Sequence, residues 1–228
     1  PKALPEISED EKPFELPKGW AFTNLGNFVF VEMGQSPPSK FYNQDKNGLP
    51  FFQGKADFGP MYPTARYWCV SPQKYAYKGD VLLSVRAPVG PTNIADIDCC
   101  IGRGLSALRP ISAIPTNYIF YMMHGFRSKL ESFATGTTFV AVSKVNVENL
   151  IVSVPPLEEQ HRIVSKVDKL MSLCDALEAQ TENSITAHQT LVEVLLEALL
   201  KAPEQTATPE QATAQFQQNW QRLSEHFD

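Results

Sequence analysis

The chain has 228 residues, of which 43% are hydrophobic and 20% charged, so it is apolar enough to fold around a core and is not an intrinsically disordered chain. It contains no apolar run near the roughly 20 residues that a membrane-spanning helix needs, and its acidic, proline-rich N-terminus is unlike a secretory signal peptide. The formal net charge of −5 is unevenly spread, because residues 1–15 carry −3, residues 16–155 carry +5 and residues 156–228 carry −7, and a basic middle segment is compatible with a polyanionic partner.

Residues 1–15 are predicted to form a linker, because they are rich in proline and acidic residues and show little periodicity. Residues 16–155 are predicted to form a β-rich mixed domain of the α+β class, since short apolar runs alternate there with Gly and Pro. The candidate strands of this domain lie at residues 28–31, 66–70, 81–85, 93–97, 105–108 and 151–154.

Two helices are predicted inside this domain, one over about residues 117–132 and a shorter one over residues 143–150. Ser143 is suited to cap the shorter helix, because a serine hydroxyl can accept a hydrogen bond from a backbone N–H of the first turn. In the longer helix the apolar residues that recur at helical spacing are Ile119, Phe120, Met123, Phe126 and Leu130.

A single long helix is predicted for residues 156–202, because residues 157–201 contain neither Gly nor Pro and are rich in helix formers. Its apolar residues recur at alternating spacings of four and three, which is the 3.5-residue repeat of a coiled coil. A helix about 65–70 Å long exceeds one compact domain, so we expect a second long helix to cover this stripe; packing along its own domain is the alternative. The residues expected to pair are Ile163, Val167, Leu170, Leu177, Leu191 and Leu195.

Residues 203–228 are predicted to be a flexible tail that holds a short amphipathic helix. Docking on a partner and free movement are both compatible with this tail. The apolar residues on one face of the helix are Phe216, Trp220, Leu223 and Phe227.

Motifs for catalysis or metal binding are missing from the sequence. The cysteines lack paired CxxC spacing, so we expect reduced thiols in a cytoplasmic protein and no zinc site or disulfide framework. No histidine stands beside a hydrolase or metalloprotease motif, and there is no nucleotide-binding loop or methyl-donor motif. The sequence therefore predicts a binding and scaffolding protein and not an enzyme. The residues concerned are Cys69, Cys99, Cys100, Cys174, His124, His161, His188 and His226.

Five short motifs follow one another along residues 16–200. They are Leu16-Pro17-Lys18-Gly19-Trp20, Gly34-Gln35-Ser36-Pro37, the segment from Gly79 to Arg86, Gly136-Thr137-Thr138, and the segment from Val154 to Val164. In this order they resemble one half of a type I restriction–modification specificity subunit, which has a target-recognition domain followed by a conserved spacer helix. The last motif is the most specific, because it is similar to the family's PPLxEQxxIV junction into the spacer helix.

The resemblance implies a non-catalytic subunit that reads one half of a bipartite site in double-stranded DNA. In the family, two spacer helices pair antiparallel, modification subunits carry S-adenosylmethionine and methylate adenine, and a restriction subunit supplies ATP-driven translocation and cleavage. We therefore expect no cofactor in this chain, with S-adenosylmethionine, ATP and magnesium held by partner subunits. Because the chain has one recognition domain and one helix, it is read either as the C-terminal half of a subunit or as a natural half-length subunit that pairs with a second copy.

The candidate DNA-contacting residues are polar or basic side chains on loops rich in Gly and Pro, because bases are read by side chains that reach the edges of the grooves. Structural roles compete with this interpretation: Arg86 and Arg103 could pair with Asp80 or Asp96, and Asp57 could cap a turn. The two threonines among the candidates could belong to a turn, and Tyr42 and Tyr62 could pack within the domain. The candidates are Gln35, Lys40, Gln53, Lys55, Ser84, Arg86, Arg103, Thr137, Thr138 and Lys144.

A second class of function competes with DNA recognition: a coiled-coil assembly protein whose β-rich head binds protein or carbohydrate. The dependence of DNA affinity on salt separates the two, because binding to phosphates falls steeply as salt rises.

Overall fold

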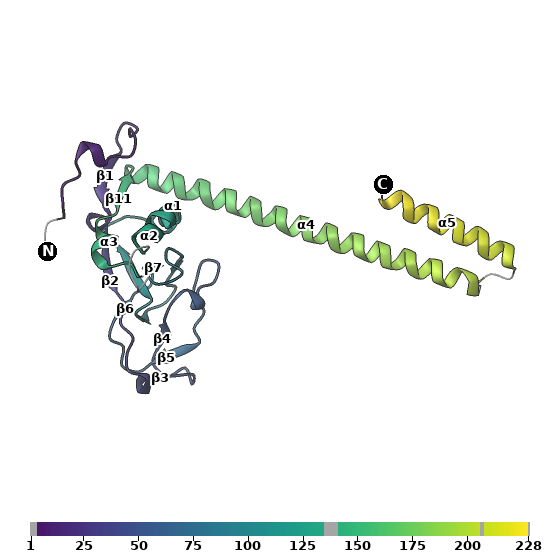
Figure 1. The fold of residues 1–228 in the computed structure, drawn as a ribbon, viewed down its shortest axis with the longest axis horizontal. Coiled ribbons are helices and arrows are strands. Elements are labelled where there is room, and N and C mark those ends of the chain that lie inside the picture. The colour runs from purple at the N-terminus through teal and green to yellow at the C-terminus, as the bar shows by residue number, and fades with distance from the viewer. Residues whose placement is uncertain (1–3, 135–140, 206–207, 228) are drawn as a thin grey trace. The chain divides into compact units, whose positions relative to one another are not determined.

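The computed structural model describes residues 4–134, 141–205 and 208–227, and the chain divides into two compact units between Lys166 and Val167 (Figure 1). The described strands and short helices belong to the first unit, and the second unit holds most of a long helix and a terminal helix. The predicted α+β class, with a mixed β-rich domain followed by a long helix, is confirmed.

The described residues of the first unit form three sheets. The smallest pairs β1 (Ala21–Asn24) with β11 (Ile151–Val154) antiparallel. The second is antiparallel throughout and has the order β2-β10-β7-β8; the third has the order β3-β5-β4-β9-β6 and one parallel pair, β4 with β9. The strands of these two sheets are β2 (Val29–Met33), β10 (Leu105–Pro110), β7 (Val81–Ser84), β8 (Thr92–Ile94), β3 (Tyr42–Asn43), β5 (Tyr67–Cys69), β4 (Leu49–Phe52), β9 (Cys99–Ile101) and β6 (Tyr75–Ala76).

Strand β7 is buried along its whole length because both of its faces are covered. Val81 and Leu83 point into the larger core, which the helices of the domain cover. Leu82 points the other way, into a smaller core that includes Phe52 and Ile101 of the five-stranded sheet. The alternation of side chains along a strand thus joins the two sheets and the helices in one layered unit.

The helix predicted over residues 117–132 is two helices, α1 (Thr116–Gly125) and α2 (Arg127–Ala134), with a break at Phe126. Glycine at the end of α1 is a poor helix former, and the N–H of Phe126 turns back to the carbonyl of Met123 at 3.1 Å. The predicted capping of α3 (Lys144–Glu148) is confirmed, since the Ser143 hydroxyl accepts a hydrogen bond from the N–H of Asn146 at 3.2 Å.

The segment before β1 lies against the domain. The side chain of Asn24 donates to the carbonyl of Pro5 at 2.6 Å, and the rings of Phe14 and Phe22 meet edge to face at 5.4 Å. This segment includes a short 3₁₀ turn, Glu9–Glu11.

The long helix α4 (Leu157–Gln205) begins inside the first unit, where Ile163 and Val164 pack against the larger core. The side chain of Gln160 is buried beside them and donates to the carbonyl of Pro155 at 3.0 Å. A further helix, α5 (Pro209–Phe227), is longer than the short helix expected in the tail. Among the described residues, no helix combines the length and apolar character needed to cross a membrane. The predicted domain limits at residues 15, 155 and 202 stay predictions.

Candidate nucleic-acid interface

Three strand ends meet at one end of the four-stranded sheet. The antiparallel registers pair Met33 with Ser106 and Ser84 with Leu105, so the chain leaves β2 and β7 where it enters β10. The order β2-β10-β7 therefore places Gln35, Arg103 and Arg86 side by side at this end. Backbone hydrogen bonds of 2.9 Å continue the ladder past the strands, from Gly34 N–H to the Leu105 carbonyl and from Val85 N–H to the Gly104 carbonyl.

Gln53 reaches the same place from the five-stranded sheet. Strands β4 and β9 run parallel with Phe52 beside Ile101. The residues that follow the two strands therefore emerge at the same end of the sheet. The N–H of Gly102 donates to the carbonyl of Phe52 at 2.8 Å, and the N–H of Gln35 donates to the carbonyl of Ile101 at 3.0 Å. The structure thus gathers four of the ten predicted residues, and we call this set, Gln35, Gln53, Arg86 and Arg103, the reading edge.

Glycines allow the loops of the reading edge to touch. A Cβ atom on Gly104 would lie 2.3 Å from the backbone oxygen of Gln53, and one on Gly34 would lie 2.2 Å from the backbone oxygen of Gly102. Neither distance is tolerable, so a side chain at either position would force the loops apart. The hydroxyl of Ser36 adds a further link by accepting a hydrogen bond from the N–H of Arg103 at 3.2 Å.

The side chains of the reading edge are exposed, and within the described part of the chain they make no hydrogen bond or ion pair. The alternative in which Arg86 or Arg103 pairs with Asp80 does not hold there, because the buried Asp80 is bound by Arg109. The guanidinium groups at this edge are therefore available to a ligand.

Asp57 has a structural role, as the capping alternative proposed. Its carboxylate is buried, accepts a hydrogen bond from the N–H of Gln53 at 2.7 Å, and pairs with Arg66 at 2.6 Å. The hydrogen bond that Arg66 donates to Asp57 raises the pKa of Arg66, and the negative charge of this carboxylate raises it further. The pair fixes the backbone of the loop from which Gln53 projects.

The three predicted lysines lie on separate short helices. Lys55 begins the 3₁₀ turn Lys55–Asp57, directly after the Gln53 loop, and is exposed. Lys40 lies in the turn Ser39–Phe41 with its ammonium 4.9 Å from the ring of Phe41. Lys144 already has partners, since it lies 3.5 Å from Glu148 and over the ring of Phe30. Of the three, Lys55 is the one directly continuous with the reading edge.

The remaining predicted residues do not join the reading edge. Ser84 is buried, and its hydroxyl donates to the carbonyls of Arg86 at 3.1 Å and Pro88 at 2.8 Å, so it shapes the turn after β7. Tyr42 packs against Phe51 with ring centroids 5.0 Å apart, which agrees with the packing alternative. Thr137 and Thr138 lie outside the described residues.

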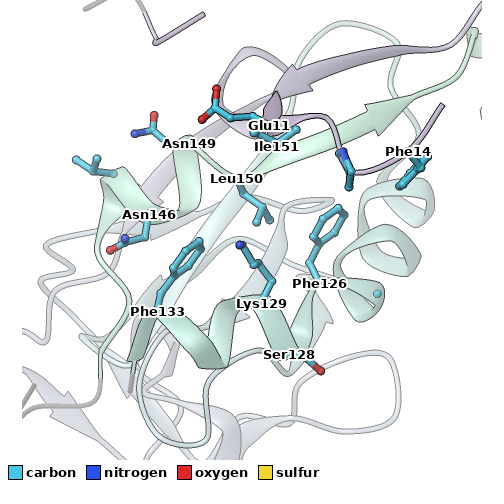
Figure 2. A pocket seen from close by; sticks show the side chains of 13 residues that line it. Glu11, Phe14, Phe126, Ser128, Lys129, Phe133, Asn146, Asn149, Leu150 and Ile151 are labelled. Atoms are coloured by element: carbon cyan, nitrogen blue, oxygen red, sulfur yellow. The ribbon is translucent and has the colours of Figure 1, made fainter. Parts of the chain in front are cut away.

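A cavity of about 690 Å³ lies elsewhere in the first unit, between the N-terminal segment, α2, α3 and β11 (Figure 2). Phe126, Phe133 and Leu150 line it, with Lys129 among them, and it includes no residue of the reading edge. Within the described ranges, no cluster of three His, Cys, Asp or Glu side chains is arranged to hold a metal ion.

Comparison with known proteins connects this arrangement to one family. Residues 17–187 match the model of the type I restriction modification DNA specificity domain. The chain is 33% identical over 251 aligned positions to the type I restriction enzyme EcoAI specificity subunit of Escherichia coli, an alignment that covers all of this chain and 39% of the relative.

Two solved structures are also similar. The HsdS subunit from Thermoanaerobacter tengcongensis is 39% identical with a TM-score of 0.66, over 94% of this chain and 46% of that one. A chain from a study of complex assembly and conformational transition of the type I R-M system is 49% identical with a TM-score of 0.69, over 75% of this chain and 43% of that one. The chain thus spans less than half the length of each of these relatives.

Proposed function

Because the chain belongs to the family of type I restriction modification DNA specificity domains, we propose that it recognises one half of a bipartite target in double-stranded DNA. The observation that carries this proposal is the reading edge, where four exposed polar side chains without partners in the described structure converge from two sheets. Arginine and glutamine are suited to base edges, since each can form two hydrogen bonds to a purine. The +5 charge of residues 16–155 adds attraction to phosphates.

The chain's own role is recognition, and the chemistry belongs to partners. S-adenosylmethionine would be held by modification subunits, and ATP and magnesium by a restriction subunit. In this scheme the chain selects the sequence and positions the subunit that methylates adenine there.

The second part of the proposal concerns α4, whose apolar stripe is exposed to solvent in the isolated chain. Leu170, Leu177 and Leu191 are 53%, 63% and 40% exposed, and continuous apolar stripes of this kind are normally covered by another helix. Ile163 already packs against the domain core, so the free stripe begins after it; the side chain of Leu195 is outside the described residues. We propose that a second spacer helix, from another specificity half or another copy, covers it together with modification subunits.

The helix pairing is tested by Leu170→Ser combined with Leu177→Ser. We expect the double variant to lose self-association or assembly with modification subunits, measured by light scattering, while the domain keeps its melting temperature. A matched Ser172→Ala and Thr186→Ala variant, at exposed positions of the same helix outside the stripe, controls for helix substitution. Unchanged assembly of the leucine variant would contradict the pairing.

The recognition function is tested by adding the chain to its modification subunit, S-adenosylmethionine and random-sequence DNA, and mapping N6-methyladenine by sequencing. Methylation at a symmetric, gapped motif would show that two copies supply both half-sites, and an asymmetric motif would mean that another recognition half is present. DNA affinity that does not fall with salt, in a complex that forms but does not methylate, would favour the protein- or carbohydrate-binding head.

A further inference from the structure

We infer that Arg103 and Gln53 read two neighbouring base pairs of the half-site, Arg103 a G·C pair through its guanine and Gln53 an A·T pair through its adenine. This inference rests on the proposed function and narrows it to a base composition. Three features of the two residues support it: their placement, their lack of partners in the described structure, and their hydrogen-bonding chemistry.

Placement comes from the parallel pairing of β4 with β9. Gln53 follows β4 directly, and Arg103 follows β9 after one glycine. Both residues therefore lie just beyond the same end of one sheet. The backbones of the two loops are in contact, as the hydrogen bond from Gly102 N–H to the Phe52 carbonyl at 2.8 Å shows. Neighbouring strands lie about 4.8 Å apart, and successive base pairs about 3.4 Å apart. Two long side chains that start this close together suit adjacent base pairs.

Availability comes from the partners of two carboxylates, Asp57 beside the Gln53 loop and Asp80 at the opposite end of β7 from Arg86. Asp57 is bound by Arg66 and by the backbone of the Gln53 loop, and Asp80 is bound by Arg109. Both carboxylates are buried, so neither competes for the exposed guanidinium of Arg103. Within the described ranges, the Gln53 carboxamide likewise has no hydrogen-bond partner.

Chemistry then assigns the bases. A guanidinium donates two hydrogen bonds to O6 and N7 of guanine, while a carboxamide donates to N7 and accepts from N6 of adenine. Cytosine presents a donor and is matched by a carboxylate, and the reading edge contains none. The edge therefore selects purines at these two positions of the strand that it faces.

The test is selection of random DNA duplexes by the full chain assembled with its modification subunit, using wild type, Arg103→Ala, Gln53→Ala and Gln53→Glu. We expect wild type to enrich a motif with adjacent guanine and adenine. Arg103→Ala should lose preference at the guanine alone, by about 5- to 150-fold, and Gln53→Ala at the adenine alone. Gln53→Glu should move the second preference from adenine to cytosine.

Two matched variants each remove a charge or an amide at a site away from the reading edge. They are Lys78→Ala, at an exposed residue of the turn before β7, and Gln180→Ala, at an exposed residue of α4. Both should keep the wild-type motif. If the Arg103 and Gln53 variants bind and keep that motif, or if they weaken all sequences alike, the base assignment is wrong while DNA recognition stands. If the wild-type assembly binds no duplex in a salt-dependent way, the proposed function itself fails.

Discussion

The guanidinium of Arg109 holds the buried carboxylate of Asp80 through two hydrogen bonds, Nε to Oδ1 at 3.0 Å and Nη2 to Oδ2 at 2.9 Å. The hydrogen bond to this carboxylate raises the pKa of Arg109. The guanidinium also lies 4.3 Å from the ring centroid of Tyr77 and 5.6 Å from that of Phe30. The pair ties β10 to the turn before β7, at the end of these strands opposite to the reading edge.

Replacing Arg109 with methionine should destabilise the domain strongly, because the buried Asp80 would lose its partner. We expect a loss of about 3 kcal/mol in the free energy of unfolding, measured by urea denaturation. Arg127→Met is the control: its pair with Glu131 is exposed along one helix, so its loss should stay below about 0.5 kcal/mol. If the two variants lost the same free energy of unfolding, the burial of Asp80 would not explain the destabilisation.

Gly104→Ala should separate the loops of the reading edge, since its Cβ would lie 2.3 Å from a backbone oxygen that cannot move freely. We expect a stability loss of about 1–3 kcal/mol and a weaker DNA sequence preference. Gly54→Ala is a matched control in the adjoining loop, because its φ of 178° suits any residue and no atom lies within 4 Å of its Cβ position. A wild-type melting temperature and motif for Gly104→Ala would contradict the contact.

Thiol reactivity should distinguish one cysteine from the other three. Burial raises the pKa of Cys99 and that of Cys100 to about 12, so neither is a thiolate at neutral pH, and Cys69 is buried beside Cys100. Cys174 is exposed on α4. Maleimide at pH 7 should modify one thiol of the native chain and four after denaturation, counted by mass spectrometry. Fast labelling of a second native thiol would be inconsistent with this core.

His124 should make the domain less stable in mild acid. His124 is largely exposed, but its partial desolvation beside the ring of Phe120, 4.6 Å away, lowers its pKa, and the charge of Arg127 on α2 lowers it further. Below the ordinary value of 6.5 the unfolded chain binds a proton that the folded chain resists, so stability is lost as pH falls through 6.5 toward the folded value. His124→Gln should show a smaller drop in urea midpoint between pH 7.5 and pH 5.5 than wild type. His161→Gln, an exposed histidine, is the control.

The sequence predicts those strands whose apolar runs are long enough to be recognised. β2, β5, β7, β8, β10 and β11 overlap the six predicted ranges, whereas β1 and β4, with four residues each but no uninterrupted apolar run, lie outside them. β3 and β6 have two residues each, too few for any periodic pattern, and they form only because neighbouring strands offer hydrogen bonds. The break between α1 and α2 escapes detection because Met123 and Leu130, on either side of it, enter the same core.

For the interface, local sequence identifies loops but not their neighbours. The Gly and Pro signals predict the loops of Gln35, Gln53 and Arg103, yet their meeting depends on pairing between β4 and β9, which are far apart along the chain. Ser84 ends a strand as Arg86 begins a turn, and sequence does not distinguish them; the fold buries one and exposes the other. The hydrogen bond between Ser36 and Arg103 cannot be predicted from the sequence, because it exists only in the folded chain.

The reading edge lies just beyond the strand ends, outside the two cores that the sheets enclose. A substitution at Gln53 or Arg103 consequently alters no buried contact, while the glycines that join the loops keep the backbone in place. Under the proposed function, single codon changes at the surface would give new half-site preferences without a compensating change in the interior. Changes at these two positions would then alter the DNA sequence that is recognised and leave the scaffold unaltered.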